Sequence, residues 1–288
     1  MSYRLFTDAT SDLPVTFAEQ YHVAVLPMGF TMDGKDYSYI PGNSEMPIET
    51  FFAKMRAGVP VTTAQINTFT FVEAFEPVLR AGEDVLYIGF SSKLSGTVQS
   101  AFAAKEELEA KYPERRVSVV DSLSASLGEG LLVYYAARKA AKMDLDSLTK
   151  WVEENKLKFA HWFTVDDLVY LKRGGRVSGA TAAIATILNI KPVMHTDDGG
   201  YLTAVSKAQG RKKSLRELFE HMLKTVIEQE TDTVFIGHCD AKTDAEYVAS
   251  LVHEQYPNML IHIDTIGTSI GAHSGPGTVA LFFVARER

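Results

Sequence analysis

The stretch 90–97 (Phe-Ser-Ser-Lys-Leu-Ser-Gly-Thr) combines residue types and a spacing that could bind an anion. It follows a short apolar run of strand-forming residues, 85–89, and precedes a predicted helix at 97–112. A strand, a hydroxyl-rich loop and a helix start bring open backbone amides together with the positive end of the helix dipole. Gly96 would let a ligand approach the backbone, and Ser95 and the threonine after Gly96 would supply hydroxyl donors. The alternative is that Ser95 only caps the helix.

Small, hydroxyl-rich segments occur at other places, each after a predicted strand or before a predicted helix: 7–12, 62–65 and 121–126. The loops after parallel strands share the carboxyl edge of a sheet, where ligands bind in α/β proteins. The carboxylates Asp8 and Asp12 of the first segment could also hold a metal or act as acid and base, or they could serve only as caps and turns.

The second half of the chain adds a basic, glycine-broken loop at 172–178 and a glycine-rich segment at 271–277. The first carries Arg173 and Arg176, whose simplest interpretation is exposure to solvent. The second carries His273, which is either a structural histidine or a group that tunes a neighbouring anion site.

Strands alternate with helices through the first half, which predicts a doubly wound parallel sheet. The expected strands are 3–7, 23–28, 85–89 and 117–120, with a small hairpin around Asp33-Gly34. The expected helices are 14–21, 47–57, 68–79, 97–112, 127–142 and 145–154. Residues 58–65 are expected to form a loop.

The pattern changes after Lys156, and we place a domain boundary there, giving an N-terminal domain at 1–157 and a C-terminal α/β domain at 158–288. The second domain is expected to contain a mixed sheet. Its expected strands are 161–164, 191–195, 201–205, 233–237, 260–263 and 278–284. Its expected helices are 165–171, an apolar helix at 180–188, an amphipathic helix with one apolar stripe that ends near Val226, and 244–255. A glycine-rich loop is expected at 267–277.

Composition places the chain among ordinary globular proteins, with 288 residues, 46% of them hydrophobic and 23% charged. The net charge of −7 argues against a general nucleic-acid binder. The single Cys239 excludes an intrachain disulfide and a cysteine-rich metal site. We expect a cytoplasmic protein, because the polar start does not resemble a signal peptide and no apolar run is long enough to span a membrane.

The chain resembles the DegV family, in particular its fatty-acid-binding FakB-type members, over essentially its whole length. The resemblance rests on five motifs in a fixed order: 7–14 (Thr-Asp-Ala-Thr-Ser-Asp-Leu-Pro), 63–65 (Thr-Ala-Gln), 91–97, 171–177 (Leu-Lys-Arg-Gly-Gly-Arg-Val) and 271–277 (Gly-Ala-His-Ser-Gly-Pro-Gly). One departure is Ala64, where the family more often has serine.

The resemblance implies a two-domain α/β protein that buries one long-chain fatty acid between its domains, with no metal and no other cofactor. It implies that Thr63 and Ser95 bind the carboxylate, helped by the amide of Gly96. Thr62, Ser92 and His273 are further candidates for this site. It also implies that a separate fatty-acid kinase makes the acyl phosphate for phospholipid synthesis, with Arg173 and Arg176 facing that kinase. Such a carrier is not itself an enzyme, and transient contact with a membrane is compatible with it.

Two other classes of function compete with a lipid carrier. A serine hydrolase could use Ser95 as nucleophile, His273 as base and Asp8 or Asp121 to orient it, although the chain lacks a Gly-x-Ser-x-Gly elbow. A nucleotide or phosphosugar binder is disfavoured, because no Gly-x-Gly-x-x-Gly follows the first strand and no Walker loop is present. We expect fatty-acid preference to depend on the shape of the binding tunnel.

Overall fold

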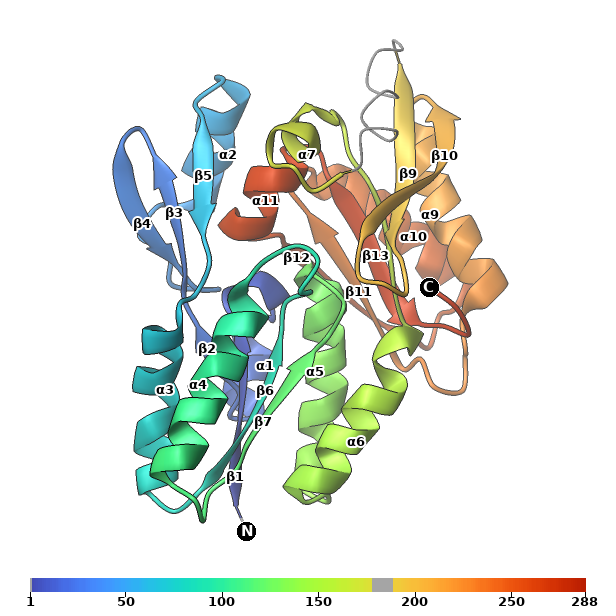
Figure 1. The fold of residues 1–288 in the computed structure, drawn as a ribbon. Coiled ribbons are helices and arrows are strands. Elements are labelled where there is room, and N and C mark those ends of the chain that lie inside the picture. The colour runs from blue at the N-terminus through green and yellow to red at the C-terminus, as the bar shows by residue number, and fades with distance from the viewer. Residues whose placement is uncertain (1, 178–188) are drawn as a thin grey trace.

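The computed structural model describes residues 2–177 and 189–288, and in this part of the chain β-sheets are surrounded by helices (Figure 1). The first sheet has parallel strands in the order β2-β1-β6-β7. They are β1 (Tyr3–Asp8), β2 (Ala24–Leu26), β6 (Asp84–Gly89) and β7 (Val117–Asp121). Parallel sheets are covered on both faces, and accordingly every residue of β6 is buried.

Helices cover both faces of this first sheet. α3 (Thr68–Arg80) and α4 (Thr97–Lys111) lie on one face, and α5 (Ser126–Ala140) and α6 (Leu145–Asn155) lie on the other (Figure 1). The segment after β1 forms a 3-10 turn, η1 (Ala9–Ser11), and then the short helix α1 (Val15–Gln20). The predicted N-terminal parallel sheet flanked by helices is therefore confirmed.

The second sheet is mixed, with the strand order β10-β9-β8-β13-β11-β12. Only β11 and β12 pair in parallel among its described strands, and the other neighbours are antiparallel. Its strands are β8 (Phe159–Thr164), β9 (Ile190–Thr196), β10 (Leu202–Gln209), β11 (Thr233–His238), β12 (Leu260–Thr265) and β13 (Val279–Val284). α9 (Arg211–Thr225) and α10 (Lys242–Gln255) pack on its outer face, and α5 packs on its inner face, between the two sheets (Figure 1). The predicted mixed sheet is confirmed.

A small antiparallel sheet, β4-β3-β5, corrects two of the predictions. It consists of β3 (Met28–Met32), β4 (Lys35–Tyr39) and β5 (Val61–Ala64), with α2 (Ile48–Arg56) in the connection between β4 and β5. The expected single strand 23–28 is split, because Pro27 has no amide to continue the ladder. The expected loop 58–65 contains β5, because its β-branched residues pair with the free edge of β3. The hairpin around Asp33-Gly34 formed as predicted.

The glycine-rich segment 267–277, expected to be a loop, forms the short helix α11 (Thr268–Ser274). Gly275 ends the helix with a φ of 83°, a left-handed conformation that glycine adopts without strain. Gly271 allows α11 to pack closely on α2, since a Cβ at this position would lie 2.8 Å from the ring of Phe52. α7 (Val169–Arg173) is shorter than the predicted helix 165–171, and the predicted helix 180–188 lies outside the described residues.

The two larger sheets share much of their core. The chain passes from α6 to β8 through η2 (Lys156–Lys158), close to the expected boundary at 157. Phe159, Phe235 and Phe282 of the second sheet nevertheless belong to the same buried apolar cluster as Leu131 of α5. The division into domains at 157 therefore stays a prediction.

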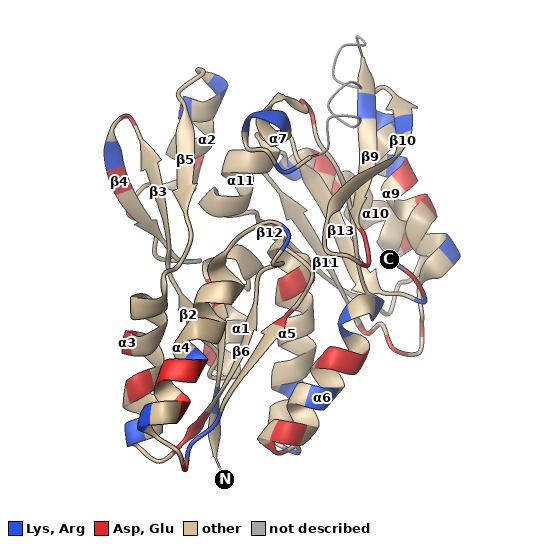
Figure 2. Cartoon of the chain, viewed as in Figure 1, with Lys and Arg blue, Asp and Glu red and all other residues tan. Residues whose placement is uncertain are grey.

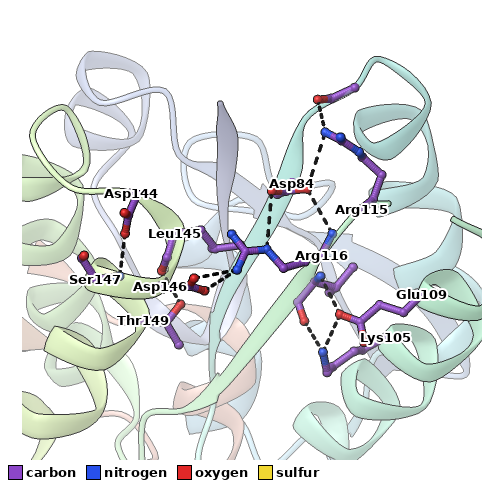
Figure 3. A network of polar contacts seen from close by, with 12 residues as sticks. Asp84, Lys105, Glu109, Arg115, Arg116, Asp144, Leu145, Asp146, Ser147 and Thr149 are labelled. Carbon is purple, nitrogen blue, oxygen red and sulfur yellow. Dashed lines mark hydrogen bonds and ion pairs between the residues drawn. The ribbon is translucent and has the colours of Figure 1, made fainter. Parts of the chain in front are cut away.

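The amino edge of the first sheet is closed by a polar network (Figure 3). The side chain of Asp84, at the start of β6, is almost fully buried and accepts the backbone N–H of Arg116 at 3.0 Å. Arg115 pairs with the same carboxylate at 3.7 Å, and Arg116 pairs with Asp146 at 2.6 Å. This network lies at the opposite end of β6 from the loop 90–97, so the carboxyl edge is the edge left open for a ligand. Among the described residues, no helix has the length and apolar character to cross a bilayer.

Candidate functional site

A cavity of ≈ 240 Å³ lies between the carboxyl edge of the first sheet, β5, α11 and the inner face of the second sheet. Its wall contains residues from all the hydroxyl-rich segments of the first half, namely Thr10, Thr63, Ser95 and Ser126. The remaining wall is mainly apolar and includes Phe90, Leu94, Phe163, Leu171, Leu202 and Ala280. The folded chain thus places a few polar groups in an otherwise apolar enclosure, which is the usual composition of a small-molecule site.

The loop before α4 contributes Ser95 and Gly96 to this wall. The Ser95 hydroxyl lies 2.9 Å from that of Thr97 and accepts the Thr97 amide at 3.2 Å. Ser95 therefore makes a capping contact and still lines the cavity. Gly96 is the N-cap residue of α4 and has no side chain to cap the helix, so the dipole of α4 begins at the cavity. A Cβ on Gly96 would overlap with the side-chain oxygen of Gln65, which packs directly over this glycine.

Thr63 on β5 and His273 on α11 meet in the same wall. Oγ1 of Thr63 lies 2.9 Å from Nε2 of His273. Burial, followed by the charge of Arg176, lowers the pKa of His273 to about 4, so its imidazole is neutral at pH 7. Nδ1 of His273 is buried and has no hydrogen-bond partner among the described residues.

The tautomer of His273 follows from that unpartnered nitrogen. A buried N–H without an acceptor is rarer in proteins than a buried acceptor without a donor. This favours a proton on Nε2, which then donates to the Thr63 oxygen. The Thr63 hydroxyl proton is consequently left for a ligand, and with Ser95 it provides two hydroxyl donors at this end of the cavity.

The structure separates the two arginines of the basic loop. Arg176 is partly buried and lines the cavity, where its Nε donates to the Leu94 carbonyl at 3.2 Å and its Nη1 donates to the Gly174 carbonyl. Burial lowers the pKa of Arg176, but a guanidinium remains charged at neutral pH. Arg173, at the end of α7, is exposed, and Figure 2 shows the basic residues of α7 beside α11. Arg176 is a cation of the cavity wall that the sequence pattern did not distinguish from Arg173.

Two other candidates do not reach the cavity wall. Thr62 is exposed and pairs in register with Thr31, because neighbouring side chains of a strand point to opposite faces and Thr63 takes the inner one. The backbone N–H of Ser92 donates to the Asp121 carboxylate at 3.2 Å, and its side chain lies outside the lining. Hydroxyl content alone could not separate these residues from Thr63 and Ser95.

A group of buried carboxylates lies behind the wall, at the end of β1, directly after η1 and on α5: Asp8, Asp12 and Glu129. Burial is the first cause that raises the pKa of each of them, for Asp12 to about 8. Hydroxyl groups donate to them, including Tyr87 to Asp8 at 2.5 Å, Ser126 to Asp12 at 2.6 Å and Thr7 to Glu129 at 3.1 Å. Among the described residues, no group of three or more acidic, histidine or cysteine side chains is arranged to hold a metal ion.

The acidic side chain of Asp12 also connects the two halves of the chain. While its Oδ2 accepts the Ser126 hydroxyl, its Oδ1 accepts the backbone N–H of Gly267 at 2.9 Å, immediately before α11. Asp12 itself has a φ of 49°, a left-handed conformation that aspartate tolerates better than most residues. Asp12 therefore positions the helix that carries His273.

The groups of the hydrolase interpretation are not assembled. His273 Nε2 is bonded to Thr63, and the Ser95 hydroxyl is bonded to Thr97. The Asp121 carboxylate accepts the amides of Ser92 and Leu123, and Asp8 is bonded to Tyr87 and Thr10. In the described part of the chain, no base is therefore within hydrogen-bond reach of Ser95, which nucleophilic catalysis requires.

The fold and the cavity define a class: α/β proteins with two large sheets that enclose an apolar space with hydroxyl donors and an arginine in its wall. A family model for DegV, which describes uncharacterised proteins, matches residues 2–286. A DegV domain-containing protein of Clostridium perfringens is 45% identical over 282 residues, covering 97% of this chain and 96% of that protein. The chain belongs to the DegV family.

Solved structures with the same fold cover the whole molecule. A fatty-acid-binding DegV family protein from Thermus thermophilus is 29% identical, with a TM-score of 0.88 over 99% of this chain and 100% of that chain. DegV of Bacillus subtilis, a fatty acid binding protein, is 25% identical, with a TM-score of 0.84 over 99% of this chain and 100% of that chain. The predicted family and fold are therefore confirmed.

Proposed function

We propose that this protein binds one long-chain fatty acid in the cavity and presents its carboxylate to a separate fatty-acid kinase. The observation that carries the proposal is the composition of the wall: hydroxyl groups and a guanidinium lie beside the start of α4, and the rest is mainly apolar. The relatives from Thermus thermophilus and Bacillus subtilis, which bind fatty acids, support it.

The carboxylate is assigned to the Thr63 and Ser95 hydroxyls and the amide of Gly96. Hydrogen bonds to a charged acceptor are stronger than those between neutral groups, and the helix dipole of α4 favours an anion at its start. Arg176 adds a positive charge to the same wall. His273 acts through Thr63, because the bond from its Nε2 orients the Thr63 hydroxyl towards the ligand.

The apolar part of the cavity supplies the affinity. About 15 methylene groups at ~0.8 kcal/mol each correspond to roughly 12 kcal/mol of transfer free energy. Immobilising the ligand and ordering the wall offset a large part of this. The remainder is compatible with sub-micromolar binding.

Presentation to a kinase is supported by the exposed Arg173 and by the lack of phosphoryl-transfer groups in the sequence. The chain contains no glycine-rich nucleotide loop followed by Lys-Ser or Lys-Thr, and such reactions need a metal-held nucleotide. We therefore assign the chemistry to a partner, and we place the protein in the cytoplasm, where the free thiol of the buried Cys239 is stable.

Mass spectrometry of organic extracts from the purified protein tests the binding step. A co-purified fatty acid in about one-to-one ratio is expected, and its absence together with failure to bind added stearic acid would contradict the proposal. The kinase step is tested separately with ATP and fatty acid. The protein alone should form no acyl phosphate, and addition of the fatty-acid kinase of the source organism should start the reaction. Short-chain esters should remain uncut, and cleavage lost in Ser95→Ala would instead support a hydrolase.

A further inference from the structure

His161 adds an imidazole to the cavity wall, on the second sheet rather than on β5 or the loop before α4. It lies on β8, where it pairs in register with Phe282 of β13. β13 begins directly after Thr278, whose hydroxyl donates to the Ser274 carbonyl of α11 at 3.0 Å. Phe282 lies four positions beyond Thr278 along the chain, which corresponds to roughly 14 Å at ~3.4 Å per residue. On the proposed function, which places the carboxylate beside α11 and the start of α4, His161 would face the acyl chain rather than the carboxylate.

The imidazole of His161 has one satisfied nitrogen. Nδ1 lies 2.8 Å from the hydroxyl of Thr196, which is completely buried. Nε2 has no hydrogen-bond partner among the described residues, and the side chain is only 5% exposed. The rings of Phe163 and Phe282 flank the imidazole, with centroids at 5.4 Å and 4.6 Å. An unpaired nitrogen thus lies between two aromatic rings in the wall of the cavity.

The charge state of His161 agrees with this geometry. Burial, followed by the charges of Arg288 and His195, lowers the pKa of His161 to about 3, so the ring is neutral at physiological pH. A neutral imidazole offers either one donor or one acceptor at Nε2, depending on which nitrogen carries the proton. Leaving that nitrogen unpaired on a largely buried side chain is unfavourable.

We propose that the cavity is built for a fatty acid with a second polar group, a hydroxyl on the acyl chain, which pairs with Nε2 of His161. A hydroxyl fits both tautomers of the imidazole, because it can donate and accept. The inference rests on the proposed fatty-acid function and specifies its ligand: long-chain hydroxy fatty acids whose hydroxyl lies away from the carboxylate. Plain acids fill the same cavity but leave Nε2 unpaired or paired only with water.

Titration of the delipidated full-length protein with stearic acid and with a set of monohydroxystearic acids tests this. We expect at least one isomer hydroxylated in the distal half to bind as tightly as stearic acid or more tightly. In His161→Leu the dissociation constant of that isomer should rise about tenfold relative to that of stearic acid, as expected for the loss of one buried hydrogen bond. His161→Gln, which keeps a hydrogen-bonding group, should retain part of the preference.

Phe163→Leu is the matched control, since it alters the neighbouring inner position of β8 without removing a polar group. Phe163→Leu should change the dissociation constants of stearic acid and of the hydroxylated isomer by the same factor. If stearic acid binds wild type at least tenfold more tightly than every hydroxylated isomer, or if the ratio is unchanged in His161→Leu, the inference is wrong while the proposed function stands. If neither class of acid binds, the proposed function fails, and the inference fails with it.

Discussion

Nε2 of His273 and Oγ1 of Thr63 lie 2.9 Å apart, although 210 positions separate them in the chain. The contact joins α11 to β5 at one wall of the cavity. Because the neutral imidazole is held between Thr63 and the backbone of Gly174, it orients the threonine hydroxyl without itself carrying a charge. The neutral state of His273 leaves Arg176 as the positive charge that this wall supplies.

Removing a hydroxyl from the site should weaken ligand binding without unfolding the protein. Ser95→Ala and Thr63→Val each delete one donor to a carboxylate, and loss of such a bond costs ~1.5–3 kcal/mol, which is roughly 10- to 150-fold in affinity. Thr62→Val is the matched control, because this exposed neighbour lies outside the wall and should bind normally. Fluorescence titration with a fatty acid measures the effect. Normal affinity in Ser95→Ala, with an unchanged melting curve, would remove Ser95 from the site.

Gly174→Ala should disturb the site through His273. Gly174 has a φ of −72°, which alanine adopts readily, so backbone strain is not expected. The added Cβ would overlap with Nδ1 of His273 and should displace the ring, at a cost of about 1–3 kcal/mol in stability or binding. A double variant with His273→Ala should show little further loss from Gly174→Ala, since the overlapping ring is gone. Additive losses in this cycle would show that Gly174 acts elsewhere.

The two arginines of the basic loop should have different effects. Arg173→Gln should leave fatty-acid affinity unchanged and slow acyl-phosphate formation by the kinase, because the exposed side chain is available for docking. The wild-type rate should also fall with added salt. Arg176→Gln should reduce fatty-acid affinity, because the guanidinium lies in the cavity wall. If the kinase works equally well with Arg173→Gln and wild type, Arg173 has no docking role.

Stability should decrease as the pH rises towards 8, with Asp12 as one cause. Burial raises the pKa of Asp12 from 3.8 to about 8, so the folded protein keeps a proton that the unfolded chain loses. Stability from this group is complete below pH 3.8 and is lost as pH rises through about 8. Between those two pKa values, each such proton lowers the free energy of unfolding by up to about 1.4 kcal/mol for every unit by which the pH rises. Asp8 and Glu129, whose pKa values are also raised, act in the same direction.

Asp12→Asn isolates the contribution of this carboxyl group. The amide oxygen can still accept the Gly267 N–H, and the side chain no longer titrates. Urea unfolding at several pH values between about 4 and 8 should therefore show a smaller decrease in stability for the variant than for wild type. Parallel curves for the two proteins would mean that folding does not raise the pKa of Asp12.

Local pattern determined most of the secondary structure of this protein. The apolar run 85–89, followed by a hydroxyl-rich loop and a helix, formed β6 and α4 close to the predicted bounds, and the predicted parallel and mixed sheets are both present. Five motifs in order also sufficed to predict the family, whose model matches residues 2–286. These features depend on short-range periodicity and turn chemistry, which a linear sequence contains directly.

The wall of the cavity was decided only in three dimensions. β5 exists because β3 offers a free edge, and the strand period then directs Thr63 inward and Thr62 outward. Packing of α11 on α2 brought His273 to Thr63, and partial burial placed Arg176, but not Arg173, in the cavity wall. His161 has the same origin, since its place in the wall depends on the register of β8 with β13. Contacts between residues distant in sequence depend on how sheets and helices pack, and residue type alone does not specify that packing.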